Sequence, residues 1–374
     1  MTPKSEDELA RLIREADGPL RITGGGTRMT RASDGETLST SALSGVTLYE
    51  PGALTLVAQA GTPVAEIEAA LDAEGQMLAF EPMDHRGLLG TSGTPTIGGV
   101  VAANVSGPRR VSSVGACRDS LLGVRFVDGS GTLVKNGGRV MKNVTGYDLT
   151  KLMAGSFGTL GVLTEVALKV LPRKPATAVL LREGLDDETA ITALCRALGS
   201  PYEVTGAAHL QRGLDGAPVT MIRLEGSEAS TAYRSDALCR NLAEFGPFTI
   251  ERDPGRTRDC WRDVRDVAPF HDRAGDIWRL SVKPTDAPAI VAAFEGAEAV
   301  YDWGGGLIWL CVPEGTDADR VRRALAGANG HVTFVRRTAT GNRFHPAAPA
   351  VAALQAGLRH RFDPRGILNP GLMG

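Results

Sequence analysis

The sequence of 374 residues lacks the features that mark several common kinds of site. Its five cysteines are widely scattered and form no CxxC pair, which argues against a zinc site, an iron–sulfur cluster or a disulfide framework and fits a reducing compartment. Lysine and arginine (41) nearly balance aspartate and glutamate (43), so the chain has none of the basic excess typical of proteins that bind nucleic acid. We therefore expect no metal site and no nucleic-acid partner.

Long hydrophobic runs are also missing. No apolar run reaches the ~20 residues of a membrane-spanning helix. The N-terminal segment MTPKSEDELARLIREAD is charged and has no apolar signal-peptide core. In that segment Ser5 and Glu8 fit a capping box that opens an amphipathic helix. Together these features predict a cytoplasmic protein without a membrane span.

What the sequence has in abundance is glycine, with 46 residues. Many of them crowd into short clusters next to β-type segments, and three such loops are Gly24–Thr27, Gly93–Gly107 and Gly155–Gly161. Successive backbone N–H groups in glycine-rich turns bind anions, and glycine lets a ligand approach the main chain closely. Three such loops in one part of the chain indicate a large phosphorylated ligand.

The usual nucleotide-binding fingerprints do not fit these loops. No GxxxxGK[ST] P-loop occurs anywhere in the sequence. The GxxGxxG run at Gly155, Gly158 and Gly161 precedes a strand-like segment, whereas a Rossmann site needs the run to follow a strand and open a helix. A nicotinamide-dependent dehydrogenase is therefore disfavoured.

The pattern of the chain changes after Pro172 and Pro175. Residues 176–336 read as strand, helix, strand, strand, helix, strand, and then as much the same order again. This order predicts an α+β domain with helices on one face of an antiparallel sheet.

Earlier in the chain, Thr62 and Pro63 fit the N-cap and first residue of another helix.

Four segments resemble the FAD-binding domain of the vanillyl-alcohol oxidase/PCMH-type flavoproteins: RITGGGT, PTIGGVVAANVSGPRR, LLGVRFVDGSGTLV and GSFGTLGVLTEVALKVLP. The ending FDPRGILNPG is similar to the family's C-terminal return into the flavin domain. More closely, GRVMKNVTGYDLTKLMAGSFGTLGV, IWRLSVKP and YDWGGGLIWL look like the FAD-binding (E) subunit of bacterial glycolate oxidase. The resemblance covers essentially the whole chain.

The resemblance implies an α+β chain in three parts. Residues 1–175 would form a PCMH-type FAD-binding domain with two subdomains. Residues 176–336 would form an α+β cap domain that contacts substrate or a partner, and residues 337–374 would return to the FAD domain.

FAD is the cofactor that the resemblance implies. In the family, backbone N–H groups of the first two loops hold the pyrophosphate and ribityl chain. The GTLGV turn lies beside the adenosine half, and a C-terminal asparagine lies near the flavin ring. Carried over residue by residue, the expected FAD-binding residues are Gly24, Gly25, Gly26, Thr27, Thr96, Ile97, Gly98, Gly99, Asn104, Gly158, Gly161, Val162 and Asn369.

Some family members bind FAD covalently through a histidine or cysteine in one of these loops. Here the first loop carries Thr27-Arg28, and the second has neither histidine nor cysteine, so we expect dissociable FAD. Cys117, just beyond the second loop, is the one thiol that keeps the covalent alternative open, although a small buried cysteine is the commoner role.

Oxidation of a 2-hydroxy acid needs an arginine for the carboxylate, a base for the hydroxyl proton, and the flavin as hydride acceptor. The candidates are Arg279 in IWRLSVKP, as a carboxylate or inter-subunit contact, Tyr147 in TGYDL, near the isoalloxazine ring, and His85 in PMDHRG, as a base. A solvated strand arginine, a packing tyrosine and a non-catalytic histidine are the alternatives. The dispersed histidines form no HxH metal pair of the kind seen in related dehydrogenases.

The favoured function is therefore an FAD-binding subunit of a glycolate oxidase, or glycolate dehydrogenase, complex. The resemblance implies a larger FAD-binding subunit and an iron–sulfur subunit as partners, with any attachment to the inner membrane made through them. Substrate would be oxidised mainly on the larger subunit, or at this chain's own flavin. Two alternatives remain: a free-standing FAD enzyme for another hydroxy acid such as D-lactate, and a non-catalytic FAD-binding assembly subunit.

Overall fold

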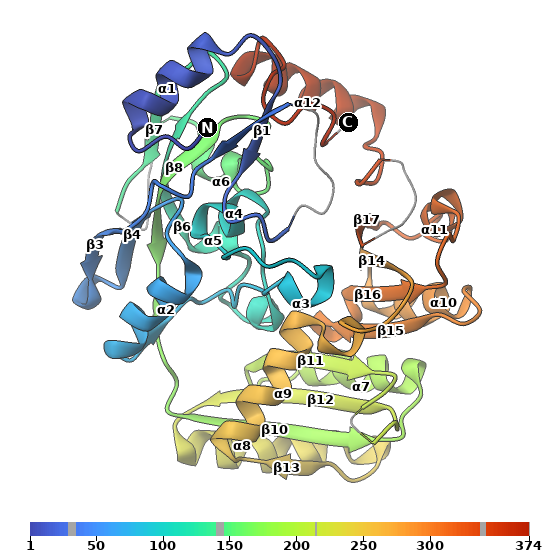
Figure 1. Ribbon diagram of the computed structural model, residues 1–374. Coiled ribbons are helices and arrows are strands. Elements are labelled where there is room, and N and C mark those ends of the chain that lie inside the picture. The colour runs from blue at the N-terminus through green and yellow to red at the C-terminus, as the bar shows by residue number, and fades with distance from the viewer. Residues whose placement is uncertain (29–34, 140–145, 214, 337–341, 374) are drawn as a thin grey trace.

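The computed structural model describes residues 1–28, 35–139, 146–213, 215–336 and 342–373. Part of the motif GRVMKNVTGYDL, at residues 140–145, lies outside the described residues. One half of the molecule holds both chain termini and several small sheets, and the other half is built on one large sheet (Figure 1). We refer to residues 1–175 with 342–373 as the FAD half and to residues 176–336 as the cap.

The FAD half is built around an antiparallel five-stranded sheet in the order β3-β4-β8-β6-β7. Its strands are β3 Val46–Glu50, β4 Thr55–Gln59, β6 Leu121–Val127, β7 Leu133–Gly137 and β8 Val162–Lys169. Two small pairs accompany it: β1 Leu20–Thr23 with β2 Glu36–Ser39, and β5 Gln76–Met77 with β9 Leu171–Pro172. The described helices of this half are α1 Glu6–Glu15, α2 Val64–Ala73, α3 Arg86–Leu89, α4 Ile97–Ala102, α5 Cys117–Ser120, α6 Leu149–Met153 and α12 Pro349–Phe362.

Two helix starts test the capping signals in the sequence. Ser5 caps α1, because its hydroxyl accepts a hydrogen bond from Glu8 N, but the Glu8 carboxylate accepts from Lys4 N instead of completing the box on Ser5. The prediction of Thr62 as the cap of α2 is wrong, because its hydroxyl donates to the carbonyls of the neighbouring turns and Pro63 occupies the cap position.

The cap is an eight-stranded antiparallel sheet made of two βαββαβ units. The first contains β10 Ala176–Glu183, α7 Asp187–Leu198, β11 Val204–Leu210, β12 Val219–Gly226, α8 Glu228–Asn241 and β13 Thr249–Glu251. After α9 Pro254–Asp266, the second contains β14 Asp276–Ser281, α10 Ala287–Ala292, β15 Glu298–Asp302, β16 Leu307–Val312, α11 Ala318–Arg323 and β17 His331–Arg336. The strand order β13-β10-β12-β11-β15-β16-β14-β17 joins the units through their equivalent second strands, β11 and β15, so the predicted repeat is real.

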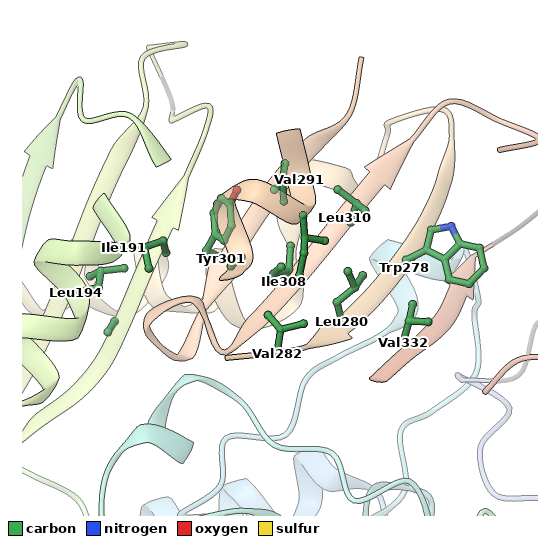
Figure 2. Packing of buried hydrophobic residues seen from close by; sticks show 14 of the residues in the cluster. Ile191, Leu194, Trp278, Leu280, Val282, Val291, Tyr301, Ile308, Leu310 and Val332 are labelled. Carbon is green, nitrogen blue, oxygen red and sulfur yellow. The ribbon is translucent and has the colours of Figure 1, made fainter. Parts of the chain in front are cut away.

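Each face of the cap sheet packs against a different layer. Helices α7, α8, α10 and α11 cover one face, where a large apolar core includes Trp278, Leu280 and Tyr301 (Figure 2). The opposite face packs on α9 and on Met83, Leu88 and Leu89 of the FAD half. Because strand side chains alternate, Arg279 faces this second side, between Trp278 and Leu280 of the first.

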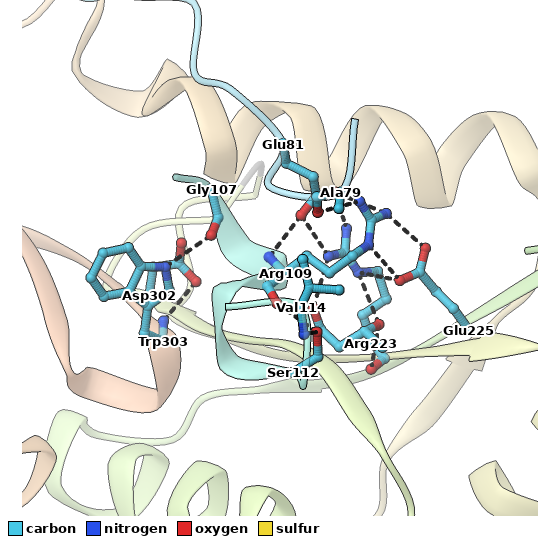
Figure 3. A network of polar contacts seen from close by, with 11 residues as sticks. Ala79, Glu81, Gly107, Arg109, Ser112, Val114, Arg223, Glu225, Asp302 and Trp303 are labelled. Atoms are coloured by element: carbon cyan, nitrogen blue, oxygen red, sulfur yellow. Dashed lines mark hydrogen bonds and ion pairs between the residues drawn. The ribbon is translucent and has the colours of Figure 1, made fainter. Parts of the chain in front are cut away.

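A buried ion network joins the two halves (Figure 3). Arg223 on β12 binds Glu81 of the FAD half through both terminal nitrogens, at 2.9 and 2.8 Å. Arg109 of the FAD half binds Glu225 on β12 through Nε and Nη2, at 3.0 and 2.9 Å. Although burial by itself raises the pKa of Glu225, the guanidinium groups of Arg223 and Arg109 lower it to about 2.

The C-terminal segment returns to the FAD half beside β1. Leu20 N donates to Ile367 O at 2.7 Å, and Asn369 N donates to Leu20 O at 2.9 Å. Among the described residues no helix is both long enough and apolar enough to cross a membrane. We propose that the domain boundaries lie near residues 175 and 337.

Replacing Glu225 by glutamine tests the network. We expect the free energy of unfolding to fall by roughly 3–5 kcal/mol, because Arg109 then keeps a buried charge without its bidentate partner. Urea denaturation followed by circular dichroism measures the change.

The matched control is Glu15→Gln, which removes an exposed i,i+4 pair with Arg11 and should cost less than about 1 kcal/mol. The depressed pKa of Glu225 also means that its contribution is present above pH 4.5 and is lost as the pH falls towards 2. Equal stability losses in the two variants, or an unchanged acid profile in Glu225→Gln, would contradict this account.

Candidate functional site

A cavity of about 430 Å³ lies where the three glycine-rich loops meet. It is lined by eleven of the thirteen predicted FAD-binding residues: Gly24, Gly25, Gly26, Thr27, Thr96, Gly98, Gly99, Gly158, Gly161, Val162 and Asn369. None of the described residues that line it is acidic. A cavity of this size and charge suits part of a large anionic ligand.

The first loop offers the backbone donors that such a ligand needs. Among the described residues, no hydrogen-bond acceptor meets the backbone N–H groups of Gly24–Thr27. Gly26 has φ +72°, and the space where its Cβ would lie is open. Successive unpaired N–H groups in this arrangement form an anion-binding nest.

The first and second loops also interlock through their glycines. A Cβ on Gly25 would lie 1.5 Å from Thr94 O, and a Cβ on Gly93 would lie 1.8 Å from Gly25 O. No side chain fits at either position, so these two glycines are required by loop-to-loop packing. This contact holds the first loop in place over the cavity.

The second loop uses its own N–H groups within the protein, which differs from the expected grip on the diphosphate. Ile97 N donates to Thr62 O and Gly98 N to Ala60 O, at 3.0 and 2.8 Å. Gly99 N lies 3.4 Å from the hydroxyl of Thr96, which caps α4. Ile97 is fully buried in the core and does not line the cavity.

Both predicted asparagines are held by the protein in left-handed backbone conformations. Asn104, with φ +48°, accepts from Arg118 N and does not line the cavity, so the expectation of a cofactor contact there is not supported. Asn369 lines the cavity, but its side chain accepts from Ile22 N and donates to Phe157 O, both at 2.8 Å. Asn369 therefore ties β1, the third loop and the C-terminal segment together.

Three arginines outside the predicted set also line the cavity, Arg21, Arg28 and Arg343. The guanidinium group of Arg21 donates to the hydroxyl of Thr37, whereas the Nε atoms of Arg28 and Arg343 are buried without a hydrogen-bond partner. Burial lowers the pKa of Arg28 to about 10 and also lowers that of Arg343, so both remain cationic at neutral pH. Arg343 lies 5.8 Å from the ring centre of Phe157, in the third loop.

This donor set fits a diphosphate, because the first loop and the guanidinium groups of Arg28 and Arg343 line one cavity, and no described carboxylate lines it. Arg28 directly follows the first loop in the sequence, and this position could have predicted it as a contact for the anion. Arg343 is far away in the sequence, and nothing in its own segment pointed to the cavity.

Cys117 is fully buried. Burial raises the pKa of its thiol to about 12, so almost no thiolate exists near neutral pH. This environment supports the expectation of dissociable FAD.

The three predicted catalytic residues lie in different surroundings. Tyr147 is 88% exposed and does not line the cavity, so its placement beside the flavin is not supported. His85 Nδ1 lies 3.3 Å from Met83 O, and burial together with the positive charge of Arg28 lowers its pKa well below its usual range. Arg279 makes no ion pair with any described acidic residue.

Arg279 is one of two arginines beside Trp303. The guanidinium carbon of Arg279 lies 5.1 Å from the centre of the Trp303 ring, and that of Arg110 lies 4.5 Å away. The indole Nε1 donates to Gly107 O at 3.0 Å, which fixes the ring between the two halves (Figure 3). Burial, followed by the charge of Arg110, lowers the pKa of Arg279 to about 10.

This arginine pair lies near the cavity. Arg279 on β14 is directly opposite Thr333 on β17, and Thr333 forms an isolated bridge with Phe344, next to cavity-lining Arg343. Two pairs of arginines thus lack ion-pair partners among the described residues: Arg28 and Arg343 line the cavity, and Arg110 and Arg279 lie beside Trp303.

Arg28→Gln and Arg343→Gln should each weaken FAD binding by roughly ten- to a hundredfold, since a hydrogen bond to a charged group contributes about 1.5–3 kcal/mol. Neither change should destabilise the cofactor-free chain, because both guanidinium groups are buried without a partner for Nε. Quenching of FAD fluorescence on titration with the cofactor-free protein gives the dissociation constants.

Arg86→Gln is the control, because Arg86 is half-exposed and already paired with Asp84 at 2.7 Å. An unchanged dissociation constant in both cavity variants would remove them from the cofactor site.

Cys117 should resist iodoacetamide at pH 8 in the folded protein and react only after denaturation, because its raised pKa leaves about one thiol in ten thousand ionised. Peptide mass spectrometry measures the modification. Acid precipitation should release all the flavin, and flavin retained on a peptide containing Cys117 would contradict the prediction.

Comparisons with known proteins identify the family and the fold. Residues 1–137 match the FAD binding domain family. The chain is 36% identical to glycolate oxidase subunit GlcE of Escherichia coli K12 over 95% of this chain and 92% of the relative. It is 30% identical to glycolate oxidase subunit GlcD of Bacillus subtilis over 100% of this chain and 88% of that relative.

The fold has a solved counterpart in p-cresol methylhydroxylase, with a TM-score of 0.70 at 13% identity over 99% of this chain and 87% of that chain. This likeness confirms the α+β, PCMH-type fold, and the family match confirms FAD as the cofactor. The chain therefore belongs to the FAD-linked oxidoreductase family that includes glycolate oxidase subunit GlcE.

Proposed function

We propose that this chain is the FAD-binding subunit of a complex that oxidises glycolate, or a closely similar 2-hydroxy acid, to the 2-oxo acid. Electrons pass through flavin to an iron–sulfur partner. The observation that carries the proposal is the pair of arginines, Arg110 and Arg279, that face Trp303 without a carboxylate partner among the described residues. Relatives named as glycolate oxidase subunits support the same substrate class.

The arginine pair suits a small carboxylate. Guanidinium groups bind carboxylates through paired N–H donors, and the Trp303 ring that both of them contact limits the room beside the anion. Arg110 comes from the FAD half and Arg279 from the cap, so the site depends on both. A 2-hydroxy acid held there by its carboxylate would present its hydroxyl-bearing carbon towards the flavin, which accepts the hydride when bound.

His85 remains our proposal for the proton acceptor. Its lowered pKa keeps the imidazole neutral at pH 7, and the contact of Nδ1 with Met83 O leaves Nε2 available. We place Tyr147 outside this chemistry because it is almost fully exposed.

The partners in this proposal are a larger FAD-binding subunit and an iron–sulfur subunit. The scattered cysteines of this chain form no cluster motif, so the iron–sulfur centre belongs to a partner. We place the complex in the cytoplasm, with any contact to the inner membrane made by its other subunits.

The experiment is anaerobic reduction of the FAD-loaded complex by glycolate or D-lactate, followed by visible absorption. Glycolate should bleach the flavin band of the complex, and the FAD-loaded chain alone should show a flavin spectrum that bleaches slowly or not at all. Failure of glycolate to reduce the complex would overturn the proposal. Rapid bleaching of the isolated chain would instead identify a free-standing enzyme.

Arg279→Met should weaken binding of oxalate, a non-oxidisable dicarboxylate, by about tenfold or more, because one of the two guanidinium groups is lost. The shift in the flavin absorption spectrum on oxalate titration measures the affinity, and FAD binding should stay unchanged.

Arg279→Lys should recover part of the affinity, and Arg258→Met, at a largely exposed position, should behave as wild type. Wild-type oxalate affinity in Arg279→Met would exclude this arginine from the substrate site.

A further inference from the structure

The C-terminal helix α12, Pro349–Phe362, has an unusual position. None of its residues is buried, and every residue from Pro346 to Leu358 is exposed. It contacts the rest of the chain near its last turn, where the Phe362 ring lies 6.1 Å from Phe126. Figure 1 shows the helix at the edge of the FAD half.

The exposed surface of α12 carries an aliphatic stripe. Val351, Leu354 and Leu358 are 47%, 70% and 39% exposed, and their spacing of three and four residues places them on one face. They make up half of the large exposed hydrophobic side chains among the described residues. A contiguous exposed apolar stripe on a helix is typical of a protein-binding surface.

The helix has few local features that stabilise it. Its cap residue, Ala348, has no side chain to bond the first N–H groups, and Gly357 lies in its interior. Isolated helices of this length are marginal in water. A helix held only near one end, with its leucines in solvent, gains most of its stability from an added binding surface.

Charge restricts what can cover the stripe. Residues 346–362 contain no acidic side chain, whereas Arg359, His360 and Arg361 occupy the last turn. An antiparallel second copy would bring each basic turn to the positive N-terminal end of the other helix, without a carboxylate on either helix to meet it. A membrane-surface helix usually carries lysine or arginine along its polar face, and here the basic residues are confined to one end.

We propose that α12 is the docking helix for another subunit of the complex, one whose surface offers an apolar groove with carboxylates at the end that receives Arg361. This inference rests on the proposed function, because it requires the chain to be a subunit. An amphipathic helix laid into an apolar groove is a common mode of recognition, with anchors at the spacing of Val351, Leu354 and Leu358.

The test is co-expression of the full chain with the larger flavin subunit and the iron–sulfur subunit, followed by affinity purification and size-exclusion chromatography. The variant Val351→Ser, Leu354→Ser, Leu358→Ser should lose co-purification, with partner affinity reduced about a hundredfold or more. FAD content and the thermal midpoint of the isolated variant should stay close to wild type, because none of the three side chains belongs to the buried core of the described residues.

A matched control changes exposed apolar residues elsewhere: Leu133→Ser, Tyr233→Ser, at 40% and 68% exposure, should assemble as wild type. Arg361→Glu should weaken assembly and test the expected carboxylates.

The outcomes separate the two proposals. If wild type assembles and the triple variant assembles equally well, the docking role is wrong and the proposed function stands. If wild type binds neither subunit, both proposals fail. Self-association, or flotation with anionic lipid vesicles, that is lost in the triple variant would reassign the helix to a second copy or to a membrane and overturn the docking proposal.

Discussion

The buried ion network between the two halves is the constraint on which the site depends. Arg223 and Glu81, with Arg109 and Glu225, hold the inner face of the cap sheet against the FAD half. Because Arg109 is fixed in this network, the next residue, Arg110, is brought to Trp303, where the cap supplies Arg279. A network built only for stability could have been replaced by apolar packing, since buried ion pairs contribute little net energy. Here it also sets the position of one half on the other.

The same network explains why four arginines near the cavity and Trp303 have no ion-pair partner among the described residues. It pairs Glu81 and Glu225 with two arginines, and the described residues that line the cavity include no acidic one. Arg28 and Arg343 at the cavity, and Arg110 and Arg279 beside Trp303, are therefore available for anions brought from outside the chain. A diphosphate and a carboxylate are the two anions that FAD and a 2-hydroxy acid provide. The fold arranges these charges at neighbouring places, although they come from four separate segments.

Glycine clusters, turn residues and the repeated order of strands and helices are local signals, and they predicted a large phosphorylated ligand and an α+β cap. The resemblance of whole motifs added FAD and the PCMH-type fold. The glycine pattern says nothing about which N–H groups of the second loop are already used within the protein. Ile97 and Gly98 donate to Thr62 and Ala60, and only the three-dimensional structure reveals those partners. The place of Arg343 at the cavity could not be predicted, because it depends on contacts between segments that are distant in sequence. The exposure of α12 could not be predicted either, because it depends on which of those contacts the helix does not make. The ring of Tyr147 lies largely in solvent, so its predicted place beside the flavin stays a prediction.

The central claim is that the free N–H groups of Gly24–Thr27, with Arg28 and Arg343, hold the diphosphate of FAD. A crystal structure of the FAD-bound chain tests it most directly. The account predicts diphosphate oxygens within hydrogen-bond distance of the first-loop N–H groups and of at least one of the two guanidinium groups. It also predicts that Ile97 N and Gly98 N keep their bonds to Thr62 and Ala60. A diphosphate bound at the start of α4, with the first loop and both arginines out of contact, would contradict the account.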